Sequence, residues 1–430
     1  PMEDSSILRY GSRGFIKSLN QYYDNSAYYL NDVLKAETNL KDMITMADGN
    51  IYVIPRYQKI LQNELGYRMW IYKPWLEKLN LSEPKTLDEF YNVLKAFKEK
   101  DPNGNGLADE IPFIGATSGG ENWFCDFIAA AFQPIDIQSN YLYPENGKIK
   151  AAYVEPEYKE ALKYLNKLCT EGLLSPSSFT SDGAQTRQTI QNPSGVQVGC
   201  FTSMAPTYLI NATDRAEGYD ILAPLTQDNG TGYAVYGASI PTNSFFITKN
   251  CQYPEAAFRL GDIMMSEEMS IWNRFGKKGT DWVEPEEGDH GMFESMGYKA
   301  KIKPILAWGS PQNSHWQQGA PAYRGYELAC ATVDSGSNIY ETRIAEHLQS
   351  YLDKKPKEYI TKIIYTEDEI NAINEIQQNI TSYRKDSVAR FIIGDWDIES
   401  GWEDYLKEMK AIGVDEMLDI VQKAYDRCNK

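Results

Sequence analysis

The sequence predicts an α/β protein that is divided into two domains. Its 430 residues exceed the length that one ordinary hydrophobic core organises. Segments with apolar residues at helical spacing alternate with short apolar runs that turn residues flank. This alternation is typical of sheets covered by helices.

Five segments carry a helical pattern. Those beginning at Thr86, Thr366 and Ser400 each start with Ser or Thr and carry Glu three residues later, which is the pattern of a capping box. Gly172 and Gly413 follow apolar periodic stretches and are expected to end helices. The predicted helices cover 86–100, 156–171, 366–376, 400–413 and 415–425.

Three apolar runs predict buried strands. They are IYVIP at 51–55, the run at 196–201, and SFFIT at 244–248. Stretches rich in turn residues near 112–122, 226–244 and 305–322 are the best candidates for crossings between the domains.

Charge and cysteine spacing exclude several classes of function. The net charge of −17 lacks the excess of Lys and Arg that binding to nucleic acid or to an anionic membrane surface requires. No stretch approaches the roughly 20 apolar residues of a membrane span. The six Cys are far apart, no CxxC pair occurs and only 3 His are present, which argues against a zinc site. The cysteines fit free thiols better than a disulfide framework.

A calcium site is predicted in DPNGNGLADEIP, residues 101–112. Counted from Asp101, oxygen-bearing side chains occupy positions 1, 3, 5, 9 and 10, and glycine occupies position 6. Ca²⁺ takes roughly 6–8 oxygen ligands, and this spacing supplies enough of them. Pro112 stands where an EF-hand carries Glu, and the alternative is a solvated turn. The expected ligands are Asp101, Asn103, Asn105, the Leu107 carbonyl, Asp109 and Glu110.

The segment 64–113 resembles family 1 of the extracellular solute-binding proteins of carbohydrate ABC importers, near its alginate-binding and LipO-like lipoproteins. Trp75-Leu76 precedes a helix capped after Pro84-Lys-Thr86, and the calcium loop follows. The resemblance covers nearly the whole chain. Further similar motifs are MADGNIYVIP (46–55), CQYPEAAFRLGDIMMSEE (251–268), TDW (280–282) and the C-terminal run ending in WEDYLKEMKAIGVDEMLDIVQKAYDR (402–427).

The resemblance implies a two-domain, type II-like periplasmic-binding-protein fold with a ligand cleft between the domains and helices at the C-terminus. Residues 1–113 and 241–305 are expected to form the first domain, and 114–240 and 306–430 the second. The family's first strand, helix and second strand are expected before residue 1. The first domain of this chain is therefore expected to lack central strands.

The resemblance also implies the function. The domains close on a carbohydrate, expected to be an oligosaccharide, and deliver it unchanged to the permease of an ABC importer. A lipid-modified Cys before residue 1 would tether the protein outside a bacterial cell, as a monomer if the N-terminus is complete. Calcium would be structural.

No catalytic motif is found: HExxH, GxSxG, P-loop and GxGxxG patterns are absent. Pairs of acidic residues leave a secreted, glycosidase-like carbohydrate-active enzyme as the alternative. A recognition protein outside transport, or one for peptides or anions, is a second alternative.

Aromatic and polar residues in glycine-rich loops are the expected ligand contacts, because rings cover sugar faces and polar groups pair with hydroxyls. One set lies in GGENWFCDF (119–127) and another in AWGSPQNSHWQQGAPAYRGYE (307–327). The expected residues are Glu121, Asn122, Trp123, Trp308, Trp316, Tyr323 and Arg324, with Arg68 and Trp70 after the strand at 51–55.

Overall fold

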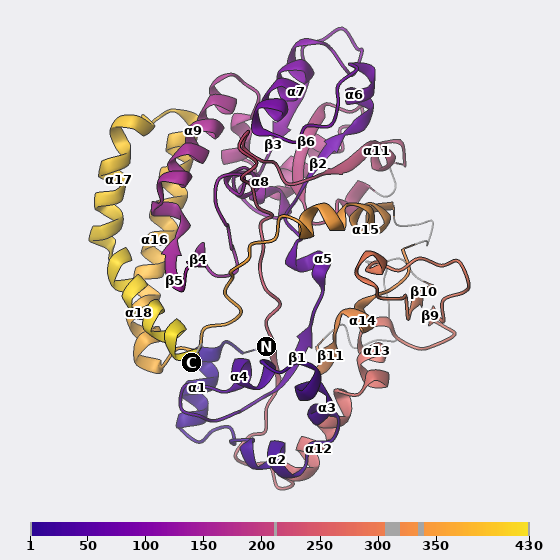
Figure 1. Cartoon of the computed structure of the whole chain (residues 1–430), viewed down its shortest axis with the longest axis vertical. Coiled ribbons are helices and arrows are strands. Elements are labelled where there is room, and N and C mark those ends of the chain that lie inside the picture. The colour runs from indigo at the N-terminus through magenta and orange to yellow at the C-terminus, as the bar shows by residue number, and fades with distance from the viewer. Residues whose placement is uncertain (1, 210–212, 306–318, 334–338, 429–430) are drawn as a thin grey trace.

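The computed structural model describes residues 2–209, 213–305, 319–333 and 339–428, and these pack around two large hydrophobic cores and a small third one of Phe275, Trp282 and Ile302. The core of the first lobe takes buried side chains from 7–57 and 247–265. The core of the second lobe takes them from 61–238 and 292–421. Figure 1 shows the first lobe at the bottom and the second at the top. Each lobe thus draws on segments that are distant in sequence.

A mixed sheet forms the centre of the first lobe. β11 runs parallel to β1, and β8 runs antiparallel to β1 on its other side. The elements of this lobe and of the small hairpin beside it are α1 (Asp4–Ser12), α2 (Asn20–Asn25), α3 (Tyr29–Ala36), α4 (Leu40–Ile44), β1 (Ile54–Gln58), β8 (Thr242–Phe245), α12 (Pro254–Met264), α13 (Glu267–Phe275), β9 (Trp282–Val283), β10 (Lys303–Pro304), β11 (Ala322–Arg324) and α14 (Tyr326–Ala329).

The second lobe contains a sheet in the order β3-β6-β2-β7, in which only the β3–β6 pair is parallel. Its elements are α5 (Leu61–Glu64), β2 (Arg68–Tyr72), α6 (Lys73–Lys78), α7 (Leu87–Glu99), β3 (Ile111–Ile114), α8 (Phe124–Ala129), β4 (Leu142–Glu145), β5 (Lys148–Ala151), α9 (Pro156–Thr170), α10 (Gly183–Ile190), β6 (Val198–Ser203), α11 (Thr213–Gly218), β7 (Tyr219–Leu222), α15 (Ile339–Leu352), α16 (Glu367–Ile393), α17 (Ile398–Ile412) and α18 (Val414–Cys428).

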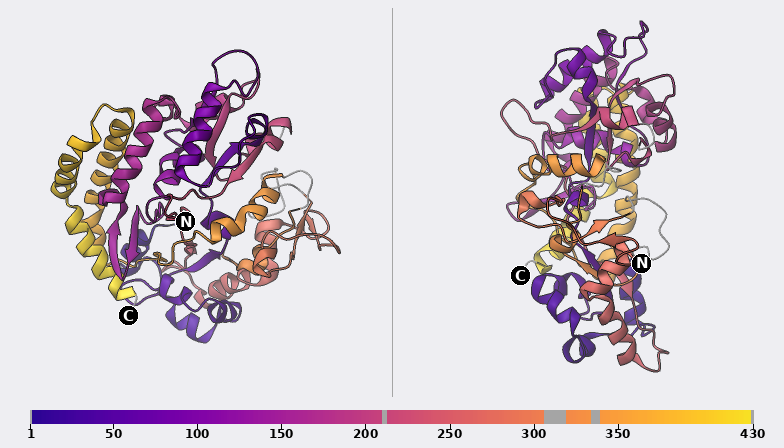
Figure 2. Two further views of the ribbon diagram at one scale, coloured as in Figure 1. Left: turned by 45° about the horizontal axis from the view of Figure 1, so that its top comes forward. Right: turned by 90° about the vertical axis from the view of Figure 1, so that its right-hand side faces the viewer.

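The C-terminal helices α16, α17 and α18 run along one side of the molecule from the second lobe toward the first (Figures 1 and 2). α16 packs against α9 of the second lobe and also contacts α1 of the first. No helix of the described residues is long and apolar enough to cross a membrane. The six cysteines are free thiols, and Cys169, Cys200 and Cys330 are buried.

Two of the three predicted capping boxes are confirmed. Thr86 and Thr366 each accept a hydrogen bond from the backbone N–H of the Glu three residues later, and that Glu carboxylate accepts one in return. The third prediction was wrong. α17 begins at Ile398 because the Asp397 carboxylate accepts the Ser400 N–H at 2.9 Å and caps the helix before Ser400 is reached.

The predicted strands exist but are shifted along the chain. The largest shift is at 51–55, where β1 covers only the last two predicted residues and continues to Gln58. Ile51 is engaged elsewhere, because its carbonyl accepts the Leu19 N–H and it bridges to Thr45. Local contacts within the first lobe therefore delay the start of the strand.

The cores divide the chain near residue 58, whereas the predicted domain boundary lay after residue 113. Residues 61–113 contribute β2, α7 and β3, which pair or pack with β6 and β7 in the second lobe. The chain re-enters the sheet of the first lobe at Thr242, just after Ala238, which belongs to the second core. Which segments move as units stays a prediction.

Asp220, on β7, anchors α15 to the sheet of the second lobe. Its buried carboxylate accepts hydrogen bonds from Arg343 Nη1 at 2.9 Å and His347 Nε2 at 3.2 Å, both on α15, and from Lys73. Burial alone would raise the pKa of Asp220, but the bonds from His347 and Lys73 and the charge of Arg343 hold that pKa well below its usual range. α15 is thereby fixed at the edge that faces the first lobe.

We predict that Asp220→Asn lowers the free energy of unfolding by about 3–5 kcal/mol at pH 7, because Lys73 and Arg343 lose the buried carboxylate that balances their charge. Since the pKa of Asp220 is lowered on folding, its contribution is present above its unfolded pKa of about 3.9 and is lost as pH falls below that value. Urea denaturation of the wild type and the variant between pH 3 and pH 7 should show the difference narrowing in acid. The exposed Asp419→Asn is the control, and an equal effect of both substitutions would contradict the anchor.

Candidate functional site

Segments that link the lobes meet at the buried carboxylate of Glu64, on α5. Its Oε2 atom accepts the hydroxyl of Tyr236 at 3.1 Å and that of Tyr326 at 3.3 Å. Its backbone carbonyl accepts the N–H of Gly237 at 3.1 Å. Residue 64 lies on the first segment that crosses between the lobes, and residues 236–237 lie on the second. Residue 326 follows β11. One carboxylate therefore joins three parts of the chain at the junction.

A second carboxylate, Glu37, joins the first lobe to this junction. It accepts Lys59 Nζ at 2.9 Å and the Tyr323 hydroxyl at 2.8 Å. Burial and the hydrogen bond to Glu37 raise the pKa of Tyr323, which therefore stays a neutral donor. The Lys59 ammonium lies 4.9 Å from the centre of the Tyr326 ring, so the Glu64 and Glu37 groups are adjacent.

The second lobe turns the carboxyl ends of β3 and β6 toward the junction. β2 is antiparallel to β6, and α5 leads into the start of β2 from the crossing. The amino end of β2 and the carboxyl end of β6 therefore lie on the same edge. Ligands of α/β sheets bind at such carboxyl ends.

Trp123 lies on this edge, at the end of a 3₁₀ turn (Gly120–Trp123) that packs on β6. The Gly120 carbonyl accepts the Thr202 hydroxyl at 3.1 Å. The Trp123 ring is half-buried and meets the Tyr67 ring edge-on at 4.6 Å. Asn122 beside it is exposed. Both residues are placed to meet a ligand at the carboxyl edge.

Glu121, in the same turn, is committed to the fold. Its side chain is fully buried and pairs with Arg187 through Oε1–Nε at 2.9 Å and Oε2–Nη2 at 3.0 Å. This two-pronged ion pair fixes α10 against the turn that carries Trp123. Glu121 therefore supports the edge and does not face a ligand, contrary to the sequence-based expectation.

Arg68 and Trp70, on β2, are also buried and bonded to backbone groups. Arg68 Nη1 donates to the Met204 carbonyl at 3.0 Å, and its Nη2 donates to the Gln62 carbonyl. The Trp70 indole donates to the Ser203 carbonyl at 2.9 Å and has no exposed surface. These side chains hold β2 to β6, so we no longer expect them to contact a ligand.

The remaining predicted contacts lie near β11 or outside the described residues. Trp308 and Trp316 belong to 306–318 and stay predictions. Tyr323 and Arg324 are neighbours on β11, so their side chains leave opposite faces of the sheet. Tyr323 turns to Glu37, whereas Arg324 lies over the Phe275 ring of α13, 5.6 Å from its centre.

Glu341, in the first turn of α15, interacts electrostatically with Arg274 of the first lobe. Burial raises the pKa of Glu341 to about 7, and the charge of Arg274 on α13 opposes that shift. α15 lies above α13 and β11 in both views (Figures 1 and 2). The start of α15 therefore faces the arginine-bearing side of the first lobe. Neither residue was identified from the sequence, because nothing in the pattern around them separates them from surface charges.

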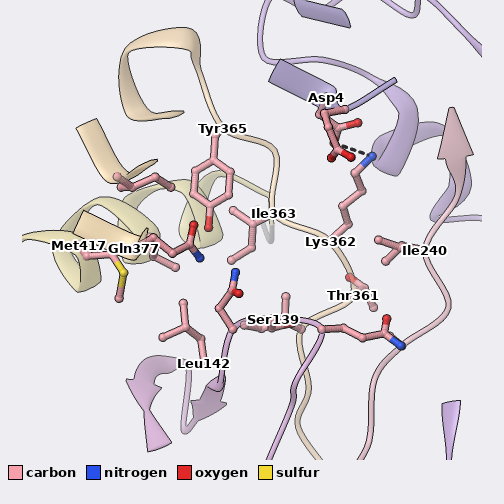
Figure 3. Close-up of a pocket in the computed structure, with 17 residues that line it drawn as sticks. Asp4, Ser139, Leu142, Ile240, Thr361, Lys362, Ile363, Tyr365, Gln377 and Met417 are labelled. Atoms are coloured by element: carbon pink, nitrogen blue, oxygen red, sulfur yellow. Dashed lines mark ion pairs between the residues drawn. The ribbon is translucent and has the colours of Figure 1, made fainter. Parts of the chain in front are cut away.

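A separate cavity of about 330 Å³ lies between α1 and the C-terminal helices (Figure 3). Figure 3 shows Asp4 and Lys362 paired across it, at 2.8 Å. The other labelled residues are polar, apolar or aromatic and include Ser139, Gln377, Met417 and Tyr365. Every predicted ligand contact among the described residues lies elsewhere, so this cavity is not the predicted cleft.

The 101–112 loop folds tightly around its own side chains. The Asp101 carboxylate accepts the N–H groups of Gly104 at 2.8 Å and Gly106 at 3.0 Å. Asp101 itself has φ +46°, and both glycines have φ +77°. Asn103 and Asn105 accept the N–H two residues on, at 2.9 and 2.7 Å. These hydrogen bonds produce the sharp turn that the sequence predicts.

The acidic side chains of the loop converge on one side. Asp109 accepts the side-chain amides of Asn103 at 2.8 Å and Asn105 at 3.0 Å, and a further amide from Gln197. These bonds lower the pKa of Asp109. Burial raises the pKa of Glu110, and the charges of Asp101 and Asp109 add to that rise.

The oxygen-bearing residues of the loop are of the types that bind a hard cation. The side chains of Asn103 and Asn105, however, are rotated so that their amide nitrogens face Asp109. Three carboxylates, two amide oxygens and a backbone carbonyl are oxygen ligands of the kind that Ca²⁺ takes. Both amides present N–H groups to Asp109, so each must turn to offer oxygen. In the described part of the chain, no group of three or more His, Cys, Asp or Glu is arranged to hold a metal ion.

Comparison with known proteins places the chain in one family. Residues 9–270 match the family model described as bacterial extracellular solute-binding protein. The chain is 26% identical to the fructooligosaccharide ABC transporter substrate-binding protein FusA of Streptococcus pneumoniae, over 99% of this chain and 78% of FusA. It is 27% identical to the lipoprotein LipO of Bacillus subtilis, over 99% of this chain and 81% of LipO.

Solved structures show the same fold. An extracellular solute-binding protein of Bifidobacterium longum subsp. infantis matches with a TM-score of 0.81 at 22% identity, over all of this chain and 86% of that one. FusA in complex with kestose matches with 0.78 at 24% identity, over all of this chain and 87% of that one. A FusA structure titled as an EF-hand mutant matches with 0.74, at 23% identity and the same coverage. The predicted two-domain α/β binding-protein fold is confirmed.

We predict that Glu341→Gln raises the melting temperature at pH 8 and leaves it unchanged at pH 4. The folded pKa of Glu341, about 7, lies above its ordinary value of 4.5. Ionisation therefore opposes folding, and stability falls as pH rises from about 4.5 to above 7. Melting curves across that range test this. The matched control is Glu346→Gln, exposed on the same helix. A constant offset between Glu341→Gln and wild type at every pH would contradict the prediction.

Proposed function

The chain belongs to the bacterial extracellular solute-binding protein family, and on that premise we propose that it captures an oligosaccharide between its two lobes. The observation that carries the proposal is the pair of separate cores joined at Glu64, with Trp123 on the sheet edge that faces the junction. Two relatives support the class of ligand: FusA is named for fructooligosaccharides, and its solved structure holds kestose.

Capture needs closure of the lobes and no chemistry. Trp123 supplies a flat apolar face for the C–H side of a sugar ring, and Asn122 supplies amide groups for its hydroxyls. Arg324 offers N–H donors from the first lobe, whereas the Tyr323 hydroxyl is engaged by Glu37. Closure around the junction brings these groups together and removes the ligand from water.

The chain is a binding protein and not an enzyme, because the matched family is that of solute-binding proteins and the relative FusA is a substrate-binding protein of an ABC transporter. The glycosidase alternative therefore loses its support. Three further points are part of the proposal. The chain delivers its ligand to the permease of an ABC importer, and a lipid anchor at the N-terminal side holds the protein at the cell envelope. The protein acts as a monomer. The names of FusA and LipO support the first two.

We also propose that the 101–112 loop holds a structural Ca²⁺ through Asp101, Asn103, Asn105, the Leu107 carbonyl, Asp109 and Glu110. Burial is the main cause that raises the pKa of Glu110, and the charges of Asp101 and Asp109 add to it. A bound cation would offset the repulsion among these three carboxylates, which supports the proposal. The FusA structure titled as an EF-hand mutant supports a metal loop in a relative. The ion would fix the turn between α7 and β3, away from the junction.

We predict that Trp123→Ala weakens oligosaccharide binding roughly thirty-fold, because a buried aromatic contact is worth about 2 kcal/mol. Calorimetry with kestose and other short oligosaccharides measures it. Tyr253→Ala removes an aromatic ring that is 74% exposed at the N-cap of α12 and should leave affinity unchanged. Equal affinity of Trp123→Ala and wild type would remove Trp123 from the site. Failure of the wild type to bind any oligosaccharide would overturn the proposed function.

We predict that EDTA lowers the melting temperature and that Ca²⁺ restores it better than Mg²⁺, which demands a tighter octahedron. Free Ca²⁺ at about 100 times its Kd stabilises the folded state by about 2.7 kcal/mol. Asp109→Ala should reproduce the EDTA effect and abolish further sensitivity, whereas the exposed Asp32→Ala should behave as wild type. Protein shown by elemental analysis to contain calcium, with a melting temperature indifferent to EDTA, would refute the structural role.

A further inference from the structure

Met204 is an exposed apolar residue that directly follows the carboxyl end of β6. It is 37% exposed, whereas all six residues of β6 before it are buried. Every other methionine of the described residues is buried or half-buried. A single exposed apolar side chain is ordinary on a protein surface, so the surroundings of Met204 decide whether it has a role.

The backbone of Met204 is held in place by two side chains of β2. The Met204 carbonyl accepts a hydrogen bond from Arg68 Nη1 at 3.0 Å, and the carbonyl of Ser203 before it accepts one from the Trp70 indole at 2.9 Å. Both donors are buried. The chain therefore leaves β6 at a fixed point, while the Met204 side chain stays in contact with solvent.

Met204 and Trp123 lie close together at this edge of the sheet. A Cβ atom added to Gly120 would lie 3.4 Å from Cζ3 of Trp123 and 3.5 Å from the backbone nitrogen of Met204. A Cβ atom added to Gly66 would lie 3.1 Å from Cε of Met204. The ring of the next residue, Tyr67, meets the Trp123 ring at 4.6 Å. The Met204 methyl group and the Trp123 indole therefore both lie against the two residues that precede β2.

This pair of apolar side chains is within reach of a ligand held between the lobes. Gly66 comes just after α5, which lies on the first segment that crosses between the lobes. Met204 and Asn122 are exposed, and Trp123 is half-buried. A methionine side chain is unbranched and polarizable, so it adapts to surfaces of different shape and is favoured where varied partners bind. Met204 can therefore extend the apolar face that Trp123 offers to a sugar ring.

We propose that Met204 contacts the captured oligosaccharide beside Trp123, and that oxidation of the Met204 thioether weakens capture. The inference rests on the proposed function and adds a residue to its ligand site. Hydrogen peroxide transfers one oxygen atom to the sulfur, which is oxidised to the sulfoxide, and the peroxide is reduced to water. The sulfoxide is polar, so the site loses an apolar contact with the C–H face of the sugar.

The first test compares variants of Met204 by calorimetry on the full chain. Kestose, maltotriose and cellotriose are the probes, and the trimer that the wild type binds most tightly is carried into the variants. Met204→Ala should weaken its binding about ten-fold. Met204→Leu keeps an apolar side chain of similar volume and should weaken binding much less. Ile393→Ala removes a side chain that is 39% exposed at the end of α16 and should leave affinity unchanged.

Oxidation gives a second and independent measurement. Hydrogen peroxide should form the sulfoxide at Met204 fastest among the methionines, and the bound trimer should slow that reaction several-fold. The sulfoxide yield at Met264, half-buried on α12, should not respond to the trimer. Peptide mass spectrometry measures both yields. Oxidised wild type should bind the trimer more weakly, methionine sulfoxide reductase should restore its affinity, and Met204→Leu should keep its affinity through the same treatment.

The outcomes separate the inference from the proposed function. Binding of a trimer that is weaker in Trp123→Ala but unchanged in Met204→Ala overturns the inference and leaves oligosaccharide capture standing. Equal rates of sulfoxide formation at Met204 with and without bound trimer also overturn the inference. Failure of the wild type to bind any oligosaccharide overturns both. If Met204→Ala fails to fold, the loss of affinity must appear in oxidised wild type and be absent from oxidised Met204→Leu.

Discussion

The molecule depends on one buried carboxylate that holds its junction together. The Glu64 carboxylate accepts hydrogen bonds from the hydroxyl groups of Tyr236 and Tyr326. The backbone carbonyl of Glu64 accepts a hydrogen bond from the N–H of Gly237. These groups belong to segments that cross between lobes with separate cores. The lobes are also linked by the contact of α1 with α16 and by the ion pair of Asp4 with Lys362. Because hydrogen bonds permit rotation more readily than interlocked apolar side chains do, a polar junction between two rigid cores is suited to closure.

Several buried carboxylates of this structure are balanced by basic groups within the chain. Asp220 is surrounded by Lys73, Arg343 and His347, and Glu37 by Lys59 and the Tyr323 hydroxyl. Arg324 is equally buried but has other arginines as its charged neighbours.

Strand register and burial decide which of the predicted ligand residues stay candidates for ligand contact and which are used inside the fold. Trp123 and Asn122 were identified because an aromatic residue in a glycine-rich polar loop is poor core material. Arg68, Trp70 and Glu121 are likewise polar or aromatic, yet the fold uses them internally, since each meets a backbone carbonyl or an opposite charge within the second lobe. Arg274 and Glu341 were not identified, because α13 and α15 become neighbours only in three dimensions.

The sequence by itself determined the features that depend on neighbours along the chain. Capping boxes at Thr86 and Thr366, the turn around Asp101 and Gly106, and the family motifs are local, since each hydrogen bond spans a few residues. Tertiary structure decided which core residues 61–113 join and whether a polar side chain faces a partner or the space between the lobes. Those outcomes depend on pairing between segments far apart in sequence, such as β2 with β6 and β1 with β11, and no local pattern specifies that pairing.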